Sequence, residues 1–67
     1  MLYRLCDESG KVLVERNDFR HLKAVFDKSG LEKVFVYAGD EKEPTFIATK
    51  ETSCAEWNSV AREVDDF

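Results

Sequence analysis

The chain has 67 residues, of which 43% are hydrophobic and 36% charged, and its formal net charge is −4 at pH 7. This length predicts one domain over residues 1–67, because so short a chain cannot build two cores, and the apolar content excludes a disordered chain. No stretch approaches the roughly 18 apolar residues of a membrane span, and the first ten residues lack the apolar run of a secretory signal, so we expect a cytoplasmic protein.

The first predicted element is a β-hairpin. Residues 2–6 and 11–15 are short runs rich in strand-forming residues, and the sequence DESG separates them. Asp7 is favoured at the first position of a type I turn, and Gly10 can adopt the positive φ that closes such a turn. This stretch therefore predicts two antiparallel strands joined by a tight turn.

An amphipathic helix is predicted next. Apolar residues recur at helical spacing from Phe19 to Phe26, which is the pattern of a helix with one buried stripe. Asn17 or Asp18 would cap the start of this helix. Gly30 would end it in the left-handed conformation that glycine adopts without steric cost.

The second half of the chain repeats this order. Residues 33–38 (KVFVYA) and 45–50 (TFIATK) are predicted strands, and the polar stretch 39–44 (GDEKEP) is the turn between them. Ser53 and Glu56 then match a capping box, so a second helix is expected to start there.

These elements predict an α+β fold in the order ββαββα, with a four-stranded antiparallel sheet and both helices packed on one face. The hairpin–helix units at 1–30 and 31–67 form a pseudo-repeat of architecture, because they share a pattern and not residue identities. Trp57 lies on the apolar stripe of the second helix and is expected in the core.

Both faces of the predicted sheet carry apolar side chains. Val34 and Val36 alternate with Phe35 and Tyr37 along one strand, so large side chains should remain on whichever face the helices leave uncovered. Monomeric domains seldom leave such a face in water. We expect a second copy of the chain or another protein to cover it, and long Lys and Arg stems covering the face are the third alternative.

Charge is distributed unevenly along the chain. Residues 1–33 carry seven Lys and Arg against six Asp and Glu, whereas residues 34–67 carry three against eight. A negative surface speeds the encounter with a basic partner. We therefore predict a small acidic protein-binding module, an inhibitor or an adaptor, with a homodimer as an alternative. The predicted partner-binding residues are Phe35, Tyr37, Asp40, Glu41 and Glu43.

Single-stranded nucleic-acid binding is the other alternative. Exposed aromatic side chains on a sheet can stack on bases, and Arg16, Arg20 and Lys23 share one flank of the first helix, where they could bind phosphate. The acidic second half disfavours this alternative, and the order ββαββα differs from the βαββαβ order usual in such domains. Asp27 follows Lys23 at i+4, which favours an ordinary salt-bridged flank.

Residues that could support catalysis or metal binding are few. His21 lacks an identifiable nucleophile or orienting carboxylate, and Cys6 and Cys54 have no metal-binding spacing. The two cysteines are expected to be free thiols in a reducing compartment, with a Cys6–Cys54 bridge left open. We therefore expect no enzyme, no catalytic residue, no metal site and no cofactor.

In size, acidity and lack of catalytic motifs, the chain is similar to many small inhibitor proteins of phages and mobile elements. Such proteins bind and block a host enzyme or nucleoprotein complex. The likeness is one of composition, so it assigns no role to any residue.

Overall fold

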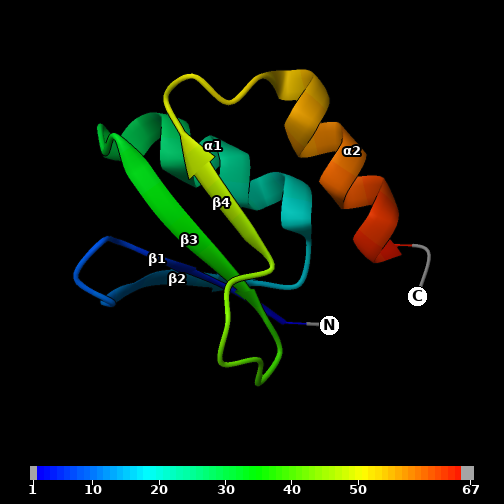
Figure 1. Ribbon diagram of the computed structural model, residues 1–67, viewed down its shortest axis with the longest axis horizontal. Helices are drawn as coiled ribbons and strands as arrows, with labels where there is room; N and C mark the ends of the chain where they lie inside the picture. Colours follow the sequence, from blue (N-terminus) through cyan, green and yellow to red (C-terminus); the bar gives the residue numbers. More distant parts are fainter. Residues whose placement is uncertain (1, 66–67) are drawn as a thin grey trace.

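The computed structural model describes residues 2–65, and Figure 1 shows their arrangement. The elements follow the order ββαββα, which confirms the predicted α+β fold. Their bounds are β1 Tyr3–Cys6, β2 Val12–Arg16, α1 Phe19–Ser29, β3 Lys33–Ala38, β4 Phe46–Thr49 and α2 Cys54–Asp65.

The four strands form one antiparallel sheet in the spatial order β2-β1-β3-β4. The two hairpins therefore pair through their first strands, β1 and β3, which lie at the centre, while β2 and β4 form the edges. In Figure 1, α1 crosses behind β3 and β4, and α2 runs beside it. Each hairpin thus supplies one central and one edge strand to a single sheet.

Local side-chain hydrogen bonds set the element boundaries at the predicted places. Asp18 caps α1, because its side chain accepts a hydrogen bond from the Arg20 N–H at 3.0 Å. Gly30 ends the helix at φ 73°. The Ser53 hydroxyl accepts from the Glu56 N–H at 3.2 Å, so the serine half of the predicted capping box is formed at the start of α2.

One hydrophobic core lies between the sheet and both helices. Two aromatic side chains hold its centre: Phe19 of α1 is 1% exposed and Trp57 of α2 is 3% exposed, and their ring centroids are 5.6 Å apart. The sheet supplies one face to this core, through Tyr3, Leu5, Val34, Val36 and Ala48. Both helices therefore pack on the same face, and the opposite face is left uncovered by them.

Candidate functional site

The uncovered face of the sheet, which we call the open face, is defined by the strand register. Residues directly opposite one another in an antiparallel ladder point to the same side. Cys6 pairs with Val12 on one side and with Phe35 on the other, and Phe35 pairs with Ile47. These four side chains form an apolar row that crosses all four strands.

A β-bulge places Val12 in this row. The register changes between Leu5 and Cys6, whose partners are Val14 and Val12, so Leu13 is the extra residue on the edge strand. Simple alternation predicts that Val12 and Val14 share a face. That prediction is wrong, because the bulge turns Val12 to the open face while Val14 packs against the core.

Two cations cover the aromatic side chains of the open face. The Arg4 guanidinium carbon lies 5.2 Å from the centre of the Tyr37 ring, and Lys33 Nζ lies 5.4 Å from the centre of the Phe35 ring. Both rings are half-buried as a result. The alternative predicted from the sequence, that Lys and Arg side chains cover the second face, therefore applies to the Phe35 and Tyr37 rings.

The ends of the apolar row remain open to solvent. Val12 is 42% exposed and Ile47 is 46% exposed, although both are large aliphatic residues. At the centre of the row, Cys6 is 4% exposed, and burial raises the pKa of its thiol. The thiol therefore stays protonated at neutral pH and acts as a small apolar group.

The acidic turn 40–43 borders this face and is tied to it by Arg4. Asp40, Glu41 and Glu43 are all exposed, together with Lys42. Arg4 Nη2 donates a hydrogen bond to the Glu41 carbonyl oxygen at 3.0 Å, and its Nε is buried without a partner among residues 2–65. The guanidinium is thus packed down between the aromatic ring and the turn.

The structure places the predicted partner-binding residues on the open face and on the turn that follows β3. Phe35 and Tyr37 lie on the open face, and Arg4 connects Tyr37 to the turn that carries the acidic residues. Sequence reasoning missed the contributions of Arg4, Lys33 and Ile47. The signal was present for Arg4 and Lys33, since each occupies a strand position of the same parity as its open-face neighbours.

The predicted phosphate-binding flank lies away from this surface and is partly engaged. Lys23 Nζ lies 2.8 Å from Asp27 Oδ2, and this hydrogen bond raises the pKa of Lys23. The Arg16 guanidinium donates to the neighbouring Glu15 carbonyl at 2.8 Å, and Arg20 is exposed. The salt bridge predicted from the i,i+4 spacing of Lys23 and Asp27 is confirmed. The predicted placement of Arg16 on the helix flank is wrong, because Arg16 is the last residue of β2 and α1 begins at Phe19.

The remaining candidate groups lie apart from one another. Cys6 is buried and Cys54 is exposed, and both are free thiols, so the alternative of a bridge between them is wrong. His21 is 69% exposed, and its Nε2 lies 3.9 Å from Asp18 Oδ2. Within residues 2–65, no group of three His, Cys, Asp or Glu side chains could hold a metal ion, and no helix is long and apolar enough to cross a membrane.

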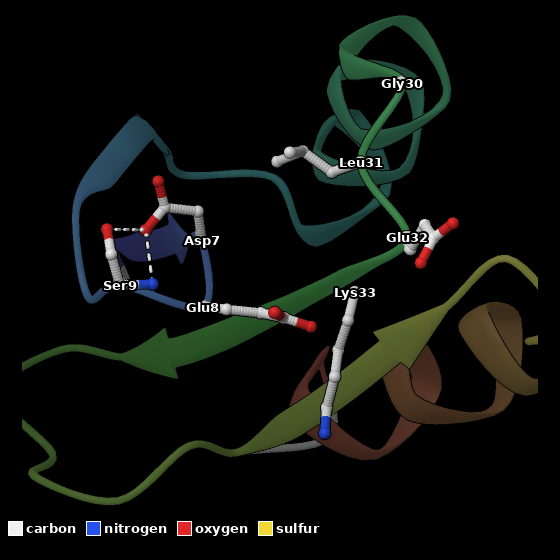
Figure 2. Close-up of a pocket in the computed structure, with 7 residues that line it drawn as sticks. All are labelled: Asp7, Glu8, Ser9, Gly30, Leu31, Glu32 and Lys33. Carbon is white, nitrogen blue, oxygen red and sulfur yellow. Dashed lines mark hydrogen bonds between the residues drawn. The ribbon is translucent and has the colours of Figure 1, made fainter.

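A hollow lies between the β1–β2 turn and the segment that joins α1 to β3 (Figure 2). In this turn, Asp7 Oδ1 accepts hydrogen bonds from the Ser9 hydroxyl at 2.6 Å, the Ser9 N–H at 2.9 Å and the Lys11 N–H at 2.9 Å. Through these bonds the Asp7 carboxylate stabilises the hairpin turn. The residues that line the hollow are Asp7, Glu8, Ser9, Gly30, Leu31, Glu32 and Lys33.

The Asp7 network predicts a loss of hairpin stability in acid. The hydrogen bond from the Ser9 hydroxyl, followed by that from the Lys11 N–H, holds the pKa of Asp7 below its ordinary value of 3.8. Stabilisation by a depressed carboxylate is fully present above the ordinary pKa and is lost as the pH falls through the folded-state value. Titration of the Asp7 side-chain carbon by NMR measures this pKa. Ser9→Ala should move it back toward 3.8, and an unchanged pKa in that variant would contradict the assignment.

Comparison with known proteins does not extend the assignment. No protein-family model, no curated protein and no solved structure matches the chain. The open face therefore has to be interpreted from its own geometry and charge.

Proposed function

We propose that the protein is a small acidic binding module whose open face docks onto another protein. The observation that carries this proposal is the apolar row across all four strands, whose two ends, Val12 and Ile47, are 42% and 46% exposed. Exposed apolar patches rimmed by polar groups are typical of protein interaction sites. The half-buried ring of Phe35 at the centre of the row is the expected anchor, because energetic centres of interfaces are well-packed aromatic groups.

The partner is proposed to have an apolar patch beside a basic surface. The acidic turn carries three carboxylates and one ammonium, all exposed, at the border of the open face. Negative potential at the rim raises association rates with a basic partner and contributes less to the final affinity. The apolar row would supply most of the affinity, and the acidic turn would orient the partner and raise the association rate.

The form of activity that fits this surface is that of an inhibitor or adaptor that blocks or bridges a host protein or nucleoprotein complex, as the compositional likeness to phage and mobile-element inhibitors suggests. The cytoplasm is the proposed compartment, because Cys6 and Cys54 are both free thiols. A site of this kind needs no cofactor, since shape and charge complementarity are sufficient for recognition.

Two features of the structure argue against the nucleic-acid alternative. Lys33 and Arg4 cover the Phe35 and Tyr37 rings that would have to stack on bases. Lys23, which would have to bind phosphate, is held by Asp27. The homodimer alternative uses the same apolar row as the proposed function and is separated from it by the mass measurement described below.

The proposal is tested by site-specific photo-cross-linking. A photoreactive residue at Ile47 should capture the partner from cells that contain it, whereas the same group at Asn58, which is exposed on α2, should not. The captured protein is identified by mass spectrometry, purified and bound to the unmodified chain. Equal capture from both positions would contradict the assignment of the open face.

Association with the purified partner should depend on the acidic turn. Replacing Asp40, Glu41 and Glu43 by the corresponding amides should lower the association rate about tenfold at low salt and flatten its salt dependence. Stopped-flow or surface plasmon resonance measures this rate. The matched control neutralises three exposed carboxylates elsewhere, Glu51, Glu56 and Glu63, and should leave the rate nearly unchanged. An equal decrease in both variants would show that only net charge matters and would remove the turn from the site.

A further inference from the structure

The two edges of the sheet differ in how their outward backbone groups are bonded. At the β4 edge, the Lys50 N–H donates to the Glu32 carbonyl at 3.1 Å, so the backbone of Lys50 bonds toward the β3 side. Bonding alternates along an antiparallel strand, so the N–H and C=O of Thr49 point away from β3. The Thr49 N–H donates to the Thr52 hydroxyl at 2.9 Å, and the Thr52 N–H donates to the Thr49 carbonyl at 3.0 Å. The turn after β4 therefore occupies the outward backbone groups at the Thr49 end of this edge, while the same alternation directs the Ile47 N–H and C=O outward.

At the β2 edge, the outward backbone groups lie at Glu15. The Gly39 N–H donates to the Leu2 carbonyl at 2.8 Å, so the backbone of Leu2 bonds toward the β3 side. Because bonding alternates along the strand, the backbone groups of Tyr3 and Leu5 bond toward β2. Their partners in β2 are Arg16 and Val14, which leaves the Glu15 N–H and C=O pointing outward. The Glu15 carbonyl accepts a bond at 2.8 Å from the guanidinium of the adjacent Arg16, an exposed side chain that an incoming strand can displace.

Apolar and charged side chains on β2 define what could pair there. Four of the five residues of β2 are exposed, and Val12 and Leu13 are 42% and 37% exposed. Val12 is also the end of the apolar row, so a strand added beside β2 would extend the open face. Glu15 shares that face with Arg4, whose guanidinium is engaged at Tyr37 and Glu41, and among residues 2–65 the Glu15 carboxylate has no ion-pair partner.

We propose that the β2 edge accepts a short extended segment of the partner as a fifth strand of the sheet. The segment places a basic side chain opposite Glu15 and an apolar side chain two positions away, next to Val12, because alternate residues of a strand share a face. The bulge at Leu13 interrupts the regular ladder, so the added strand is short. This inference rests on the proposed function and specifies how the partner is held.

The proposal is tested with nine-residue peptides followed by NMR and amide hydrogen exchange. An acetylated peptide of alternating Lys and Val residues should shift the amide signals of residues 12–16 and slow the exchange of the Glu15 amide at least tenfold at saturation. A peptide with Glu in place of Lys should bind at least tenfold more weakly. Either no slowing of the Glu15 amide at millimolar Lys–Val peptide, or shifts that map to β4 instead, would overturn the proposal.

Two variants separate backbone pairing from charge. Glu15→Pro removes an outward N–H and no bond to β1, so the fold should persist while peptide binding is lost. Glu15→Thr keeps the N–H, so it should lose the preference for the Lys peptide and retain slowed exchange at position 15. If Glu15→Pro does not fold, the exchange measurement on the unmodified protein still decides. Failure of these tests with Ile47 cross-linking intact would reject the fifth strand and keep the proposed function.

Discussion

Replacing Trp57 by alanine is expected to lower the free energy of unfolding by about 3–5 kcal/mol. Trp57 is 3% exposed, and its ring centroid lies 4.9 Å from that of Phe46, 5.6 Å from Phe19 and 6.1 Å from Phe26. Through these rings Trp57 connects α2 to both α1 and the sheet. Truncation leaves a cavity at this junction and removes the aromatic contacts of three rings.

A loss of this size is a large fraction of the total stability. Domains have stabilities of about 0.05–0.15 kcal/mol per residue, which for a chain this short gives roughly 3–10 kcal/mol in total. Urea unfolding followed by far-ultraviolet circular dichroism measures the loss without relying on tryptophan fluorescence. Asn58→Ala, at an exposed position on the same helix, is the control and should change the stability little. A cost below about 1 kcal/mol for Trp57→Ala would contradict the placement of α2 on the sheet.

Replacing Phe35 by alanine is expected to weaken partner binding by about 2 kcal/mol or more, which is roughly a thirtyfold loss of affinity. Phe35 lies at the centre of the apolar row, between Cys6 and Ile47, on the face that neither helix covers. Because its ring is outside the core between sheet and helices, the cost in folding stability should be well below that of Trp57→Ala. Tyr37→Ala should behave similarly and should also loosen the acidic turn, because Arg4 packs between the ring and Glu41.

Isothermal titration calorimetry with the cross-linked partner measures this effect, and chemical unfolding measures the stability of the variant. Val25→Ala is the matched control, because Val25 is half-buried against the core and should lower stability without changing affinity. Unchanged affinity for Phe35→Ala would remove the apolar row from the interface. Collapse of the fold would show that Phe35 belongs to the core.

Local chemistry made the boundaries of the elements predictable. Asp18, Gly30 and Ser53 act within three residues of their own positions, so the sequence around each one contains the information that determines it. The hairpin turn at Asp7 is equally local. The predicted order ββαββα followed from these signals and from the period of the apolar residues.

The details of the open face depend on pairing between distant segments, which a single sequence does not display. The bulge that turns Val12 outward arises where β2 meets β1, and no residue type in β2 marks it. Arg4 reaches Tyr37 and Glu41 across 33 and 37 positions of the chain, a proximity that exists only once β1 and β3 have paired. The apolar second face was therefore predictable, and so was cationic cover as one alternative, but the pairing of Arg4 with Tyr37 was not.

The solution mass of the purified protein tests the central proposal most directly, because a face that binds a partner must be free when the partner is absent. Light scattering over a wide concentration range should give the monomer mass of 7.7 kDa throughout. A stable dimer of twice that mass that dissociates when Phe35 is replaced by alanine would contradict the account. The apolar row would then be covered by a second copy of the chain and would not be available to another protein.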